Sequence, residues 1–291
     1  MLEYFLQNKD ISQIDTVCNH LNKTKHKLLE NNWNIPTEDF ELCADLFLEI
    51  KEIAIQRKDE KLANAQFVFK NYFMLFCNLL CYFDLLEKRQ YKISWNKLQD
   101  CLDDVKYVGR FTEVENRLEL SEIYDLLVQY EALYPYNVFT SSEYVISKSH
   151  CSICGESMQS LACPHIKGEL YWGNPAIEYI DKIDVIQAIC LVSHPEDKRC
   201  ILEMSEDTRT EKEKFQMLDQ YLELNQPYLQ KAKIKVIKEL RMREDIKIVG
   251  RNQSCLCGSG KKFKHCCGKN IYYEYKRYVV TPSSVVDLIM V

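Results

Sequence analysis

FVFKNYFMLFCNLLCYFDLL, residues 67–86, is the stretch that decides the architecture of this 291-residue chain. On a helix of 3.6 residues per turn its apolar side chains point in almost every direction, so protein must cover such a helix on all sides. Its most apolar part, residues 71–83, lies between Lys70 and Asp84. That part is shorter than the roughly 20 residues that a membrane span needs. The stretch therefore predicts the central helix of a bundle, with no membrane span.

Helical patterns continue on both sides of this stretch. A helix is expected over residues 94–108, with Ser94 as its N-cap. One face of that helix would carry Trp95, Leu98, Leu102 and Val105. The chain contains only 8 Gly and 7 Pro, so few residues interrupt helices before Pro135. We expect a mainly α protein whose first 135 residues form a helical bundle.

The pattern changes over residues 136–208, where Cys, His, Gly and Pro become frequent and helical periodicity weakens. VIQAICLV, residues 185–192, is an apolar run of strand length, and residues 199–202 are a candidate partner for it. We expect a small zinc-stabilised α+β domain in this region.

The C-terminal third predicts three further segments. Residues 209–250 are rich in Lys and Arg and predict a long basic helix that ends at Gly250. Residues 251–270 form a cysteine-rich module. Residues 271–291 form a short tail that can fold back on the rest of the chain.

Charge is distributed unevenly along the sequence. Residues 231–278 contain 14 Lys/Arg and 4 Asp/Glu, a formal charge of +10 in a chain whose net charge is −5. The basic region is either a solvated surface or a binding surface for an anionic partner such as RNA, the ribosome or an acidic protein face. Nucleic acid is therefore one of the partners that residues 231–278 suit.

Four cysteines gather in NQSCLCGSGKKFKHCCGK, residues 252–269: Cys255, Cys257, Cys266 and Cys267. Two close pairs of thiolates separated by a short loop can converge on one tetrahedral ion. Gly258 and Gly260 permit the left-handed turns that bring the loop back. Phe263 can pack over the site, and His265 is a spare candidate ligand. Since so short a loop has almost no core, metal binding would supply its folding free energy.

This segment resembles the SEC-C motif, the metal-binding tail of the SecA translocase ATPase. The residues that coincide with the family pattern are Asn252, Cys255, Cys257, Gly258, Ser259, Gly260, Lys261, Lys262, Phe263, Lys264, Cys266, Cys267 and Gly268. Ser254 and Leu256 stand where the family usually has proline. The resemblance implies a structural site for zinc, or for iron, and docking to a chaperone such as SecB or to the ribosome.

A second group of metal-ligand residues lies in the middle of the chain: Cys151, Cys154, Cys163 and His165. Cys151 and Cys154 with Gly155 have the spacing of a zinc knuckle, in which the glycine lets the chain turn under the ion. His150 is a spare candidate ligand. The sequence thus predicts two zinc ions per chain.

Two functions follow from these features. We expect a non-enzymatic, cytoplasmic, bacterial adaptor that docks through the SEC-C segment and the basic C-terminal region. The alternative is a metal-dependent enzyme, a nuclease-like effector of a defence system, with its site near His165 and residues 171–174. Among catalytic motifs, the sequence contains no P-loop, HExxH or GxSxG.

Overall fold

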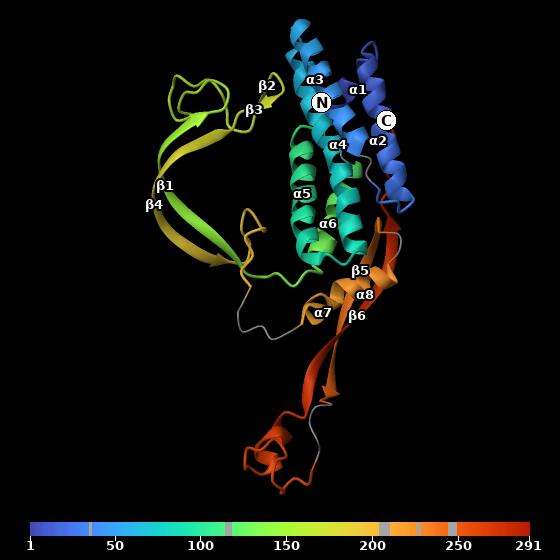
Figure 1. Cartoon of the computed structure of the whole chain (residues 1–291), viewed down its shortest axis with the longest axis vertical. Helices are drawn as coiled ribbons and strands as arrows, with labels where there is room; N and C mark the ends of the chain where they lie inside the picture. Colours follow the sequence, from blue (N-terminus) through green and yellow to red (C-terminus); the bar gives the residue numbers. More distant parts are fainter. Residues whose placement is uncertain (35–36, 114–117, 204–209, 226–227, 244–248) are drawn as a thin grey trace.

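The computed structural model describes the whole chain except residues 35–36, 114–117, 204–209, 226–227 and 244–248. The helices are α1 (Leu2–Gln7), α2 (Ser12–Leu29), α3 (Thr37–Gln56), α4 (Glu60–Glu87), α5 (Tyr91–Arg110), α6 (Leu118–Glu131), α7 (Glu211–Lys214) and α8 (Gln216–Leu224). The strands are β1 (Phe139–Cys151), β2 (Leu170–Tyr171), β3 (Asn174–Pro175), β4 (Glu178–Val192), β5 (Gln230–Met242) and β6 (Tyr272–Val285), and Figure 1 shows their arrangement. Helix accounts for 45% of the chain and strand for 22%, so the mainly α class holds only roughly.

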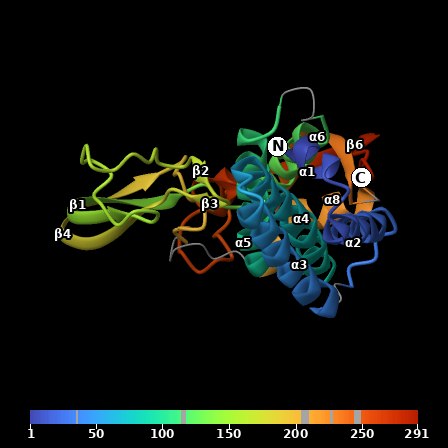
Figure 2. The ribbon, with the colours of Figure 1, turned by 90° about the horizontal axis from the view of Figure 1, so that it is seen from above.

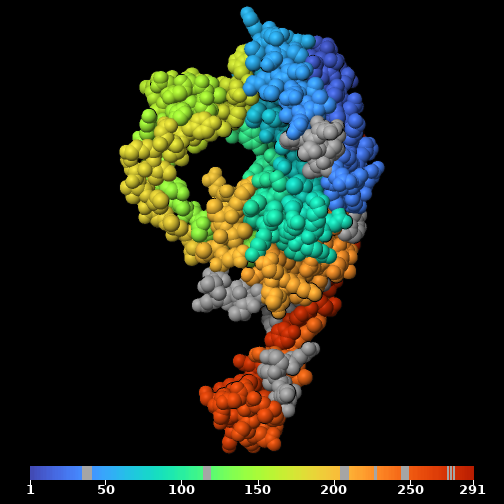
Figure 3. Space-filling model, viewed as in Figure 1, coloured from blue at the N-terminus to red at the C-terminus, as the bar shows by residue number. Residues whose placement is uncertain are grey.

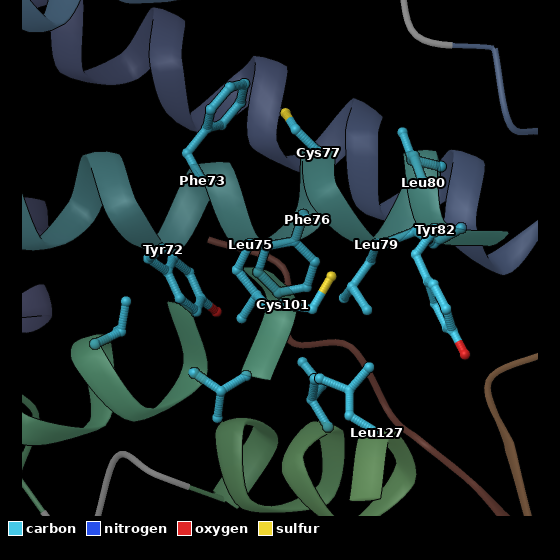
Figure 4. Close-up of a cluster of buried hydrophobic side chains, with 14 of the residues drawn as sticks. Tyr72, Phe73, Leu75, Phe76, Cys77, Leu79, Leu80, Tyr82, Cys101 and Leu127 are labelled. Atoms are coloured by element: carbon cyan, nitrogen blue, oxygen red, sulfur yellow. The ribbon is translucent and has the colours of Figure 1, made fainter. Parts of the chain in front are cut away.

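Helix α4 is the centre of the bundle, and α1, α2, α3 and α5 all contact it. The Asp59 carboxylate caps its start by accepting a hydrogen bond of 2.9 Å from the backbone N–H of Leu62. Buried side chains project from α4 in several directions, as Tyr72, Phe73 and Phe76 show (Figure 4). The predicted central helix is thereby confirmed. No helix in the described part of the chain is both long and apolar enough to cross a membrane.

The structure corrects the start of the next helix. Helix α5 begins at Tyr91, so Ser94 is an interior residue and not the N-cap. Its buried hydroxyl donates to the carbonyl oxygen of Tyr91 at 3.0 Å, a local bond that serine can form within a helix. The predicted apolar face is confirmed, since its four members are all buried: Trp95, Leu98, Leu102 and Val105.

Strands β1 and β4 form a long antiparallel ribbon that extends to one side of the bundle (Figure 2). The space-filling view shows an opening between this ribbon and the helices (Figure 3). The ribbon starts where Phe139 pairs with Val192 and ends where Cys151 pairs with Glu178. Four register shifts interrupt the pairing, and such irregularities bend a strand.

The predicted strand over residues 185–192 is confirmed as part of β4, but its expected partner is wrong. It pairs with β1, whereas residues 199–202 lie against the start of β1 instead. There the backbone N–H of Thr140 donates to the carbonyl oxygen of Cys200 at 2.8 Å. The partner strand of β4 thus comes from much earlier in the chain.

The predicted long basic helix over residues 209–250 is wrong. The region holds two short helices, α7 and α8, followed by strand β5, which pairs with β6. The sequence AKIKV, residues 232–236, alternates apolar and polar residues with period two, as a half-exposed strand does. The distant partner stabilises this strand, because β6 supplies a complete antiparallel ladder from Ala232 to Met242.

The end of the chain returns to the bundle. The backbone N–H of Val286 donates to Leu229 O at 3.0 Å, and the Val291 N–H donates to Asn22 Oδ1 at 2.9 Å. The Lys25 ammonium donates to Ile289 O at 2.5 Å. The β5–β6 ribbon is thus fixed at its base, while its far end carries the cysteine-rich module away from the helices (Figure 1).

Candidate metal centres

The four C-terminal cysteines come together at the far end of the β5–β6 ribbon. Cys255 and Cys257 lie in the loop that follows Ser254, whose bridge to Lys262 closes the loop. Cys266 lies between two short 3-10 turns, residues 263–265 and 267–269, and Cys267 is the first residue of the second turn. The Sγ atoms of the four cysteines all lie within 4.8 Å of one another. The structure therefore brings this predicted set together.

The spacing of the sulfur atoms fits one tetrahedral ion. Cys257 Sγ lies 3.4 Å from Cys266 Sγ, which lies 4.0 Å from Cys267 Sγ. Sulfur atoms that share a tetrahedral zinc at 2.3 Å lie about 3.8 Å apart. A disulfide would require about 2.05 Å, and all four cysteines are free. The donor set and its geometry fit a closed four-thiolate site.

Hydrogen bonds favour the thiolate form of the first pair. The Ser259 hydroxyl lies 3.1 Å from Cys266 Sγ, and its hydrogen bond to Cys257 lowers the pKa of that thiol to about 6. Hydrogen bonds from the backbone N–H groups of Cys257 and Cys267 lower the pKa of Cys255. Because the thiolate is the metal ligand, these donors favour ion binding.

Two features of the loop agree with the sequence. Gly258 and Gly260 have φ values of +79° and +69°, the left-handed conformation that glycine adopts without strain. Phe263 is buried, at 4% exposure, together with Cys255. The module therefore has a very small core, which is typical of a fold that depends on its ion.

The central cluster lies at the tip of the β1–β4 ribbon. Cys151 is the last residue of β1, and Cys154 follows in a tight turn at Gly155, whose φ is +77°. Cys163 and His165 lie in the loop that leads to β2. The Cys151 sulfur accepts a hydrogen bond of 3.4 Å from the Ile153 N–H.

Its four candidate ligands are also brought together within 4.8 Å. Cys154 Sγ lies 3.7 Å from Cys163 Sγ, and His165 Nδ1 lies 3.7 Å from Cys151 Sγ. A sulfur and a nitrogen on one tetrahedral zinc lie about 3.6 Å apart. The Tyr171 ring is perpendicular to the imidazole, with 4.6 Å between the ring centroids, and helps to orient His165.

Neither spare histidine belongs to a cluster. His150 Nδ1 lies 2.9 Å from the Asp181 carboxylate on β4. His265 lies beside the C-terminal cysteines but outside the group of atoms that could share an ion. The best candidate ligand sets are therefore three cysteines and one histidine in the central cluster and four cysteines in the C-terminal cluster.

The loop of residues 171–174 does not form an open site. The Gly173 N–H donates to Asn64 Oδ1 at 2.7 Å, and Lys51 Nζ donates to Asn174 Oδ1 at 2.8 Å. A Cβ at Gly173 would lie 2.7 Å from the backbone oxygen of Ala63. This loop therefore attaches the central cysteine cluster to α3 and α4, while the Trp172 side chain stays 38% exposed.

Sequence reasoning missed the bundle residues that hold this loop. Asn64 is 8% exposed, and apart from Gln66 the other buried residues of α4 are apolar or aromatic. A buried amide must find hydrogen-bond partners, so its presence in that helix was a usable signal. Its partners, Gly173 N and Leu170 O, could not be identified from local sequence.

Comparisons with known proteins concern the C-terminal module. Residues 251–269 match the SEC-C motif model. The SecA translocase subunit of Dichelobacter nodosus is 86% identical over 21 residues, 7% of this chain and 2% of that protein. That of Bacteroides fragilis is 47% identical over 55 residues, 18% of this chain and 5% of that protein.

A longer match, to SecA of Geobacter sulfurreducens, is 33% identical over 94 residues, 32% of this chain and 8% of the relative. The chain thus covers less than a tenth of the length of these relatives. No solved structure matches it. These matches to SecA subunits cover 7% to 32% of this chain, and residues 251–269, which contain the four cysteines, are a SEC-C motif.

Proposed function

We propose that this chain is a zinc-dependent docking adaptor of the bacterial cytoplasm. Each cluster would hold one zinc ion, with iron as the alternative in the SEC-C module. Four protein ligands leave no position for water or substrate, so both ions would stabilise the fold and not catalyse a reaction. The observation that carries the proposal is the position of the SEC-C module at the far end of the β5–β6 ribbon.

That position suits capture of a partner. A ribbon of 13 residues spans roughly 40 Å, so the module lies clear of the bundle. Lys261, Lys262 and Leu256 are exposed on the module. Cationic groups around an apolar side chain suit an acidic, partly apolar surface on a chaperone such as SecB or on the ribosome.

The test is to replace Cys255 and Cys257 with serine. We expect the double variant to bind one zinc per chain instead of two and to lose capture of purified SecB or of isolated bacterial ribosomes. Its bundle should unfold at an unchanged temperature, because the module does not contribute to that core. Cys190→Ser, at an exposed cysteine outside both clusters, is the matched control. Capture that survives in the double variant would contradict the docking role.

A further inference from the structure

The β5–β6 ribbon has two chemically different faces. Between Ala232 and Met242 the pairing has no register shift, so alternate residues of each strand point to opposite faces. One of them is here called the basic-aromatic face. Its members are Lys233, Lys235, Ile237, Glu239 and Arg241 of β5 with their partners Tyr273, Tyr275, Arg277, Val279 and Thr281 of β6.

Aromatic rings on this face lie beside cationic groups. The Arg241 guanidinium lies over the Tyr275 ring, 3.5 Å from its centroid. The Tyr273 ring is 6.5 Å from the Tyr275 ring and perpendicular to it, and Tyr273 is 45% exposed. A guanidinium plane and an exposed phenol ring are both surfaces on which a nucleobase can stack.

The acidic residue on this face orients two of the cations. Glu239 accepts a hydrogen bond of 2.9 Å from Arg277 Nε and one of 3.5 Å from Arg241 Nη2. Four cationic side chains and one carboxylate leave this face with a formal charge of +3. Lys233 and Lys235 are exposed and continue the positive charge toward the bundle.

The opposite face has a different character. Its β5 members Val236, Leu240 and Met242 are 48%, 76% and 50% exposed, and Lys238 is the cationic residue among them. The cations of β5 are therefore concentrated on the basic-aromatic face, which has Lys233, Lys235 and Arg241 against Lys238 on the other. Exposed tyrosine occurs on both faces, since Tyr272, the partner of Met242, is 61% exposed. The contact between the Arg241 guanidinium and the Tyr275 ring, beside the exposed Tyr273, is what distinguishes the basic-aromatic face.

We propose that the basic-aromatic face binds a single-stranded polynucleotide. Phosphates would contact the two lysines and the two arginines, and bases would stack on Tyr273 and on the Arg241–Tyr275 pair. A duplex hides its base faces within its own stack, whereas a single strand can present them to these side chains. An acidic protein surface would use the cations but would not need the exposed ring. The inference extends the proposed docking role, on which it rests, and adds a ligand next to the SEC-C module.

The experiment measures fluorescence anisotropy of labelled 12-nucleotide oligouridine, oligothymidine and a 12-base-pair duplex with the full-length, zinc-loaded chain. We expect both single strands to bind more tightly than the duplex. Affinity should fall with salt with a log–log slope of about −2 to −3, as expected for three to four neutralised phosphates. Tighter binding of oligouridine than of oligothymidine would identify RNA as the source.

Substitutions on the two faces decide the assignment. Tyr273→Ala and Arg241→Ala should each weaken binding by about tenfold, the loss typical of one stacked base. Lys238→Ala, which removes one charge from the opposite face, should change the affinity less than twofold. Wild-type protein that binds no single strand at low salt, equal binding of the duplex, or equal losses from Lys238→Ala and Arg241→Ala would each overturn the proposal.

The two proposals have separate readouts. Tyr273→Ala should retain two zinc ions and capture of the protein partner. The Cys255→Ser and Cys257→Ser double variant tests that capture by itself. Loss of one readout with retention of the other would show which proposal fails.

Discussion

At the scale of single residues, Lys25 is a buried cation in the bundle. Its ammonium lies 2.9 Å from the Tyr72 hydroxyl and 3.1 Å from Glu119 Oε1, and it also donates to Ile289 O. Burial lowers its pKa, and the charge of Glu119 opposes that effect. The group therefore links α2, α4, α6 and the C-terminal segment.

Lys25→Met should lower the free energy of unfolding by about 3 to 5 kcal/mol, because it leaves the Glu119 carboxylate buried without its cation. Adding Glu119→Leu should recover a large part of that loss, since no isolated charge then remains. Urea denaturation of both variants measures the difference. A double variant less stable than Lys25→Met would contradict the assignment.

Asp104 is a second residue with an unfavourable environment. Burial raises its pKa to about 6, although Asn78 donates a hydrogen bond of 2.6 Å to its carboxylate. A raised pKa means that the folded state holds the proton more tightly than the unfolded state. Stability from this group is thus present at low pH and is lost as the pH rises from about 4 to above 6.

Asp104→Asn should therefore stabilise the protein by about 1 to 3 kcal/mol at pH 8, since it keeps an oxygen for Asn78 without a charge. At pH 5 the gain should be smaller. Thermal unfolding at the two pH values checks this, and an equal gain at both would show that the carboxyl is not the cause.

Residues close together in the sequence could be predicted, and residues brought together by the fold could not. The eight metal-ligand candidates occur in two short segments, so their spacing alone grouped them. Asn64 and Gly173 are separated by 109 positions and meet only because the β1–β4 ribbon returns to the bundle.

At the scale of elements, α4 and β5 show the same difference. Residues 67–86 are apolar on almost every side, and a helix at the centre of a bundle can bury all of these sides. The predicted central helix was therefore correct. β5 contains lysines that also suit a helix and alternates polar and apolar residues only over a short stretch around residues 232–236, so its pairing with β6 is needed to stabilise the strand. Local propensity carried no information about that distant partner.

The turn between β2 and β3 should be sensitive to size at Gly173. Gly173→Ala adds a methyl group 2.7 Å from Ala63 O at a φ of +68°, so the turn must move away from α4. Amide hydrogen exchange should then increase at residues 170–175. Gly258→Ala is the control: it has a similar φ and nothing within 4 Å of the added carbon, but it lies in the SEC-C module, so it should leave exchange at residues 170–175 unchanged. Unchanged exchange in Gly173→Ala would contradict this attachment.

At the scale of the whole molecule, two antiparallel ribbons extend from one helical bundle. The β1–β4 ribbon is attached at both ends, through the Phe139 region and through the β2–β3 turn. The β5–β6 ribbon is attached only at its base and carries the SEC-C module at its tip. The central cluster therefore lies in a segment that contacts the bundle at both ends, whereas the C-terminal cluster lies in a module that projects from it.

This difference predicts unequal effects of losing each ion. Cys151→Ser with Cys154→Ser should increase hydrogen exchange along β1, β4 and the β2–β3 turn, because the tip that joins them loses its ion. The corresponding change in the SEC-C module should leave exchange in these strands unchanged. Equal effects on the β1–β4 ribbon would contradict separate roles for the two clusters.

The account depends most on two closed sites, and X-ray absorption at the zinc edge with metal analysis of the purified chain tests it directly. The predicted result is two zinc ions per chain, coordinated in total by seven sulfur atoms at about 2.3 Å and one nitrogen at about 2.0 Å. One ion or none per chain, or an oxygen ligand from water at either site, would contradict it.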